Sequence, residues 1–143
     1  MSPTDRIAGT RIDTALLVLR VVFGTIFAAH GAQKLFALGV AGVTAGFEQM
    51  GVPLPGLAAP LVTFVEFAGG LALIAGLFTR LAALGLMFDM LGAMLLVHLK
   101  NGFFLPSGIE FVLALGTVAL VLLLVGPGAY SADAMLKRRR ALP

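Results

Sequence analysis

Four long apolar stretches constrain the fold of this chain more than any other feature of its sequence. They cover residues 14–38, 57–77, 81–99 and 107–125. A helix needs about 20 mostly apolar residues to cross the hydrocarbon core of a bilayer, and each stretch comes close to that length. Only 12% of the residues are charged, against about 25% in soluble domains. We therefore expect an all-α integral membrane protein, built as a four-helix bundle in the lipid bilayer.

The segments around these stretches set the domain boundaries. Residues 39–56 are rich in Gly and Pro and predict a loop with room for a short interfacial helix. Residues 79–80 predict a very tight turn between the second and third spans. We divide the chain into an N-terminal segment, residues 1–13, a four-span domain, residues 14–128, and a basic tail, residues 129–143.

The basic residues predict the orientation of the spans. Cytoplasmic loops carry an excess of Lys and Arg, and four spans place both termini on one side. That side would collect Arg80 and the basic run at residues 137–140, whereas the other side receives only Lys34 and Lys100. We therefore predict that both termini are cytoplasmic. A single short basic run is explained by its effect on membrane orientation and does not predict binding to a nucleic acid.

Ionisable residues inside the spans are the best candidates for a functional site, because they are costly to bury in a membrane. With a rise of about 1.5 Å per residue, Arg20, Glu66 and Asp89 fall into a middle layer. An arginine with two carboxylates at its depth predicts a buried ionic cluster. The cluster could bind the polar head group of a ligand, such as a quinone, or could serve only to fix the register of the helices. The sequence leaves both interpretations open.

A second set of ionisable residues falls near the outer boundary: His30, Lys34, His98 and Glu110. Lysine side chains at such a depth commonly extend to the interface, which is sufficient to explain Lys34. The spacing of the two histidines and the glutamate matches no known metal motif, so we predict no metal site. On a straight helix His98 points about 180° away from Asp89, so either His98 is interfacial or its helix bends.

Three blocks of the sequence resemble the DoxX family of membrane proteins. The first is LLVLRVVFGTIFAAHGAQKL, with Arg20, His30 and Lys34 at matching positions. The second is VEFAGGLALIAGLFTRLAA, with Glu66 and several glycines, and the third is LLLVGPGAYSAD. The blocks occur in the family's order, and the likeness covers nearly the whole chain beyond the first dozen residues.

The resemblance implies a multi-pass protein of the bacterial or archaeal cytoplasmic (inner) membrane. Members of the family include a small subunit of a thiosulfate:quinone oxidoreductase and anchors of redox or thiol-stress complexes. The implied role is therefore a membrane anchor or accessory subunit of a quinone-linked redox or oxidative-stress complex. The implied partners are redox-enzyme subunits or further copies of the chain, and the implied ligand is a quinone, with no cofactor held by the chain itself.

The residues themselves favour a role other than that of an independent enzyme. The sequence contains no nucleophile–base pair and no glycine loop for a nucleotide, and its lack of cysteine excludes a thiol relay by its own side chains. We assign no catalytic residue. The alternative to a redox subunit is a non-enzymatic membrane protein that binds or transports a small molecule or holds a partner, with a buried ion cluster that is purely structural.

Overall fold

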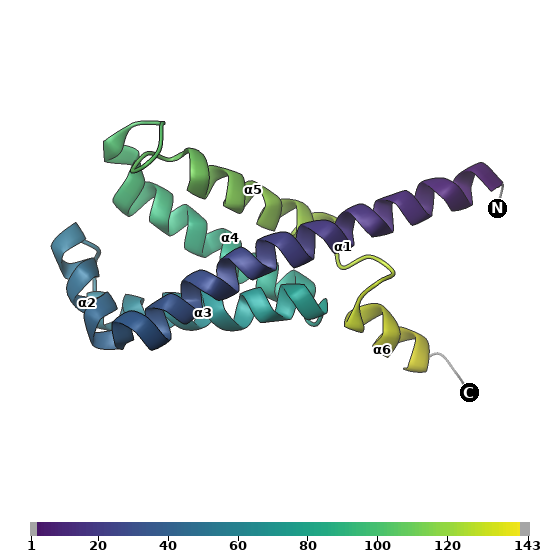
Figure 1. Ribbon diagram of the computed structural model, residues 1–143, viewed down its shortest axis with the longest axis horizontal. Helices are drawn as coiled ribbons and strands as arrows, with labels where there is room; N and C mark the ends of the chain where they lie inside the picture. The colour runs from purple at the N-terminus through teal and green to yellow at the C-terminus, as the bar shows by residue number, and fades with distance from the viewer. Residues whose placement is uncertain (1–2, 141–143) are drawn as a thin grey trace.

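The computed structural model describes residues 3–140, so residues 1–2 of our N-terminal segment and 141–143 of our basic tail lie outside it. All regular secondary structure in the described part is helical (Figure 1). The helices in chain order are α1 Pro3–Ala32, η1 Gln33–Leu38, α2 Gly39–Met50, α3 Pro55–Ala75, α4 Thr79–Ala93, η2 Met94–His98, η3 Leu99–Asn101, α5 Glu110–Val125 and α6 Ala132–Arg140. Of these, η1 and η2 are π-helical and η3 is a 3₁₀ turn.

The long helices form the expected bundle. α1 packs on α3, α3 on α4, and α4 on α5, while α2 folds back onto α3 at the end of the bundle far from α6 (Figure 1). Three helical stretches of the described residues are long and apolar enough to cross a membrane: Ile7–Met50, Pro55–Ala75 and Thr79–Asn101. α5 is also apolar but has only 16 residues. The all-helical membrane architecture is thus confirmed, with three to four apolar helices compatible with a membrane bundle.

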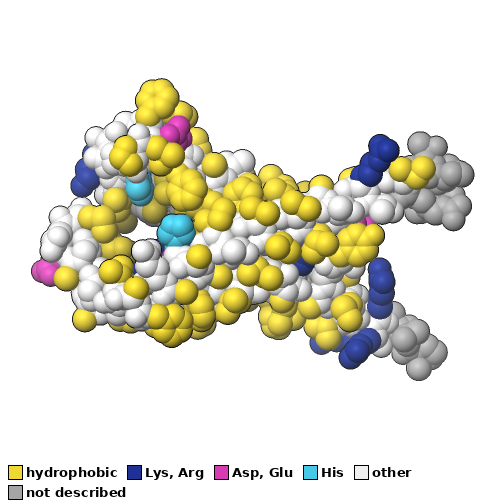
Figure 2. Space-filling model, in the orientation of Figure 1, with side chains coloured by type: hydrophobic (Ala, Val, Ile, Leu, Met, Phe, Trp, Pro, Cys, Tyr) yellow, Lys and Arg dark blue, Asp and Glu magenta, His cyan; other side chains and the backbone are white. Residues whose placement is uncertain are grey.

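The surface of the bundle fits a lipid environment. Large apolar side chains such as Phe64, Leu71 and Leu81 are more than 45% exposed, and Figure 2 shows hydrophobic side chains over much of the visible face. The basic side chains gather instead near α6 and the first turns of α1, which lie at the same end of the molecule (Figures 1 and 2). Which side of the membrane this end faces stays a prediction from the charge pattern.

The first helix is longer than the sequence predicted. α1 begins at Pro3 rather than near Thr14, and helical structure continues through η1 into α2. Residues 39–50, predicted as a loop with room for a short helix, are therefore helical throughout. Their glycines lower helix propensity, but Val43 is only 4% exposed where α2 packs on α3, and this tertiary contact outweighs the low propensity.

Small residues allow α1 and α3 to approach closely. A Cβ atom on Gly24 would lie 2.8 Å from the Gly70 carbonyl oxygen, and a Cβ on Gly31 would collide with the backbone of Phe67. Helices in membranes gain packing contacts where small residues let their backbones meet. This close contact fixes how the polar residues of α1 and η1 face those of α3.

Candidate functional site

A cavity of about 600 Å³ lies at the end of the bundle opposite α6. Its wall is formed by α1, η1, α2, α3, α4, η2, α5 and the segment before α5, and Figure 2 shows the surface hollowed beside two histidine side chains. Small-molecule sites commonly measure about 300–1,000 Å³. The lining is apolar except for five ionisable side chains, which are His30, Lys34, Glu66, Asp89 and His98.

An ion pair forms the centre of this polar group. The ammonium of Lys34, on η1, donates a hydrogen bond to Oε2 of Glu66, on α3, and the two side chains are 20% and 6% exposed. Lys34 therefore turns into the bundle, and the prediction that it extends to the membrane interface is wrong. The reason is that Glu66 is buried among apolar residues, where an unpaired carboxylate would be costly.

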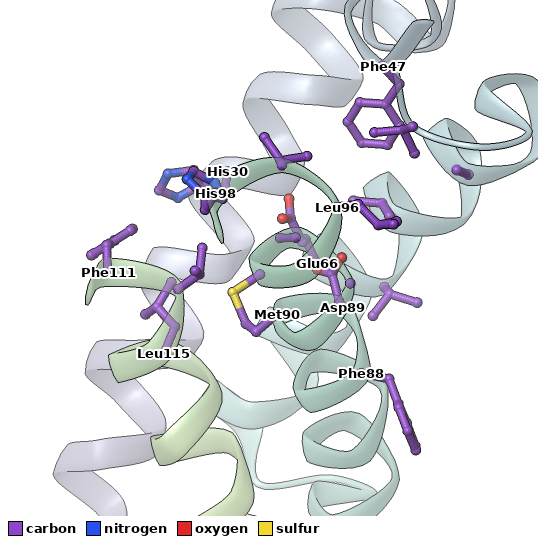
Figure 3. A pocket seen from close by; sticks show the side chains of 18 of the residues that line it. His30, Phe47, Glu66, Phe88, Asp89, Met90, Leu96, His98, Phe111 and Leu115 are labelled. Atoms are coloured by element: carbon purple, nitrogen blue, oxygen red, sulfur yellow. The ribbon is translucent and has the colours of Figure 1, made fainter. Parts of the chain in front are cut away.

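Asp89, on α4, completes the group. It interacts electrostatically with Glu66 and Lys34, and Figure 3 shows Glu66 and Asp89 close together in the wall of the cavity. Its Oδ2 atom is buried and has no hydrogen-bond partner among the described residues. If all three groups were ionised, the cluster would carry one surplus negative charge. A buried cluster of this composition favours a further proton or a hydrogen-bond donor.

The two histidines lie at the rim of the cavity, and each is held through one ring nitrogen. Nδ1 of His30 lies 2.9 Å from the carbonyl oxygen of Ile26, and Nδ1 of His98 lies 2.8 Å from that of Ser107. His98 and Asp89 line the same cavity although they are opposed on a straight helix. The π-helical segment η2, which contains His98, changes the helical register. Of the two alternatives for His98, an interfacial position or an irregular helix, the structure therefore shows the irregular helix.

Glu110 does not join the two histidines. Its Oε1 accepts a hydrogen bond of 2.6 Å from the backbone N–H of Leu105, where the chain turns into α5. Among the side chains of residues 7–140, no three His, Cys, Asp or Glu gather closely enough to hold a metal ion. The outer group predicted from sequence is therefore divided, with His30, Lys34 and His98 at the cavity and Glu110 in a local turn.

Arg20 lies far from Glu66 and Asp89, with which the depth estimate grouped it. Lys34, the partner of Glu66, lies 14 positions further along the same helical path. At a rise of about 1.5 Å per residue, this corresponds to about 21 Å. Its guanidinium is fully buried and donates to the backbone carbonyl oxygen of Tyr130. Depth along the spans compares only their own side chains, whereas the partner of Arg20 is a backbone carbonyl group beyond the last span.

The segment that contains Tyr130 forms a C-terminal latch, which we define as residues 126–133. The carboxylate of Asp133 accepts hydrogen bonds from the backbone N–H groups of Phe78 (2.8 Å) and Thr79 (2.9 Å), and its own N–H donates to the Gly76 carbonyl oxygen (2.9 Å). Burial by itself would raise the pKa of Asp133, but these N–H groups at the start of α4 outweigh it and hold the pKa below its ordinary value.

The latch also explains the turn between α3 and α4. This turn lies at residues 76–78, slightly before the predicted position, and both Gly76 and Phe78 have positive φ values of 67° and 48°. A positive φ is costly for phenylalanine, and the hydrogen bond from Phe78 to Asp133 stabilises it. The second and third sequence blocks, together with Arg20 of the first, therefore meet in one structural junction.

Comparisons with known proteins agree with this architecture. The DoxX family profile matches residues 15–99. The inner membrane protein YqjF of Escherichia coli is 34% identical, over 89% of this chain and 95% of its own. "Putative oxidoreductase CatD" of Bacillus subtilis is 32% identical over 77% and 79% of the two chains, and the inner membrane protein YphA of Escherichia coli is 29% identical over 87% and 92%.

No solved structure matches the chain significantly. The profile covers more than half of the chain, and YqjF aligns over nearly its whole length. The apolar helices and the relatives that are named inner membrane proteins also agree on location. This chain belongs to the DoxX family and is a multi-pass protein of the cytoplasmic (inner) membrane.

Proposed function

We propose that this chain is an anchor or accessory subunit of a redox complex, and that its cavity binds the ring of a quinone-type molecule. The proposal is carried by the Lys34–Glu66 pair with Asp89 beside it, in the wall of a cavity that is otherwise largely apolar. Ligand sites commonly combine apolar walls with a few polar groups that orient the ligand. The name of CatD, one of the relatives, lends further support.

The chemistry of the lining suits a flat ring with polar substituents. Phe27 and Phe111 offer apolar surface for a ring, Lys34 offers a donor for a ring oxygen, and Asp89 offers an acceptor for a ring hydroxyl. Leu61, Leu96 and Phe111 line the cavity although each is at least 40% exposed. The cavity therefore extends to the apolar outer surface of the bundle, and a lipid-soluble molecule would enter from the bilayer.

An accessory role fits the composition of the chain. It has no cysteine, so its own side chains provide no thiol couple to exchange electrons with a quinone. We assign electron transfer to another subunit of the complex and ligand binding to this one. Co-purification from native membranes tests this assignment, because it predicts that redox-enzyme subunits accompany the tagged chain. Purification of the chain alone, or only with further copies of itself, would contradict it.

The ligand site is tested by titration of the purified full-length protein in lipid nanodiscs with a short-chain ubiquinone. We expect saturable binding that the double substitution Lys34→Met with Glu66→Gln weakens by about tenfold, the usual effect of losing one charge-assisted hydrogen bond. Glu48→Gln is the matched control, since Glu48 is exposed on α2 and does not line the cavity. Absence of saturable binding, or equal binding by the double variant, refutes the site.

A second candidate is a non-enzymatic protein in which buried charges serve only the fold. One observation favours this reading for Arg20, whose guanidinium binds the latch through the Tyr130 carbonyl oxygen. If the same held for Lys34 and Glu66, their double substitution would change stability alone. Quinone binding would then be absent from the unmodified protein as well.

A further inference from the structure

The geometry points to a cavity that binds the reduced, hydroxyl-bearing form of a ring molecule more tightly than its oxidised, carbonyl-bearing form. This inference rests on the proposed function, because it concerns the same cavity. A reduced quinone ring carries two O–H groups that donate hydrogen bonds, whereas the oxidised ring carries only carbonyl oxygens that accept them. Which form is preferred therefore depends on whether the cavity presents acceptors or donors.

The two histidines present acceptors. A backbone carbonyl oxygen can only accept, so the contacts of 2.9 Å to Ile26 and 2.8 Å to Ser107 require that Nδ1 carries the hydrogen in both rings. In a neutral imidazole the other ring nitrogen is then a lone-pair acceptor. Nε2 of His30 and Nε2 of His98 are the ring nitrogens that remain for a ligand at the rim (Figure 3).

Asp89 presents a third acceptor. Its Oδ2 is buried and unpartnered among the described residues, and a buried polar atom without a partner is costly. As a carboxylate oxygen, Oδ2 offers lone pairs that accept a hydrogen bond. A hydroxyl hydrogen of a ligand would satisfy it.

Donors are scarcer in the lining. Among the ionisable side chains at the cavity, Lys34 is the permanent donor, and Glu66 engages one of the three N–H groups of its ammonium. The remaining lining residues are apolar or glycine. Three acceptor atoms thus line a cavity in which Lys34 is the single permanently charged donor, and a site built to pair with a hydroxyl discriminates strongly against an analogue that lacks it.

The test compares three probes with one ring skeleton on the unmodified full-length protein in nanodiscs. They are trimethylhydroquinone, its oxidised quinone, and its dimethyl ether, which keeps both oxygens but has no O–H donor. Calorimetric titration under nitrogen should show that the hydroquinone binds at least about tenfold more tightly than either of the others. Equal or tighter binding of the quinone or the ether overturns the inference and leaves the proposed function intact. Binding of none of the three refutes both.

Two further arms assign the preference to named groups. Asp89→Leu should reduce the hydroquinone preference, whereas Asp89→Asn, which keeps an acceptor oxygen at this position, should retain most of it. A preference that is unchanged in Asp89→Leu contradicts the role of Oδ2. Benzyltrimethylammonium tests whether the cavity selects positive charge instead of hydroxyl donors, and tighter binding of this cation than of the hydroquinone would overturn the inference.

Discussion

Removal of the Lys34 ammonium should destabilise the protein far more than removal of the whole ion pair. In Lys34→Met, Glu66 and Asp89 lose the cation that faces them inside an apolar wall. Breaking a buried pair in this way costs about 3–5 kcal/mol. The Lys34 side chain is 20% exposed, so some solvent screening remains, and we expect a cost near 3 kcal/mol.

The double variant Lys34→Met with Glu66→Gln provides the comparison. It removes both partners and leaves no unpaired charge between them, and such replacements are often nearly neutral. Its cost should therefore be well below that of Lys34→Met alone. Asp89 stays in place in both variants, so the difference between them isolates the cost of leaving the buried Glu66 carboxylate unpaired.

Thermal unfolding in a mild detergent measures both variants against the parent protein. A loss of about 3 kcal/mol corresponds to a fall in Tm of roughly 6–12 °C for a chain of this size, and the double variant should recover most of it. Glu48→Gln, on the exposed surface of α2, serves as the control with no expected shift. The reasoning is refuted if Lys34→Met unfolds at the parent temperature, or if the double variant unfolds as early as the single one.

Three further predictions concern the latch, the helix contact and the topology. Because the pKa of Asp133 is lowered from its ordinary value of 3.8, its stabilising effect is present above that value and is lost as the pH falls through the lowered one. Unfolding between pH 6 and 2 should show this acid-dependent loss, and Asp133→Asn should remove it. Gly70→Leu should prevent stable folding, measured as a loss of monodisperse protein, because a Cβ there meets the Gly24 carbonyl oxygen at 2.7 Å. Gly46→Leu, with open space around it, should be tolerated. Since the chain has no cysteine, a single cysteine at Met135 should react with an impermeant thiol reagent only from the cytoplasmic side, and labelling from outside would contradict the predicted orientation.

Much of the fold could be predicted from the sequence because the membrane imposes strong constraints. A span needs a continuous apolar run, so the existence and order of the long helices follow from hydropathy. The glycines near Glu66 similarly indicated a close helix contact, which Gly70 and Gly24 make. Residues 39–50 were harder, because their glycines suggest a loop and only packing against α3 makes them helical.

The site could be predicted only in part, for reasons that lie in the backbone. Arg20 binds the carbonyl oxygen of Tyr130, and a sequence gives no indication of which carbonyl groups will lie near a given side chain. His98 shares a cavity with Asp89 because a π-helical segment alters the register of its helix, which a fixed angle of about 100° per residue cannot anticipate. The depth of Lys34 alone predicts an interfacial side chain, whereas a buried carboxylate on the neighbouring helix provides the stronger attraction.

Photolabelling can show whether the cavity containing Lys34, Glu66 and Asp89 binds a quinone-type ring. An azido-substituted short-chain quinone would be irradiated with the full-length protein in its native membrane, and labelled peptides would be identified by mass spectrometry. We predict saturable labelling of cavity residues such as Phe47 and Phe111, which excess unlabelled quinone suppresses. Labelling that is confined to the lipid-facing surface and unaffected by the competitor would show that the cavity does not bind the ring.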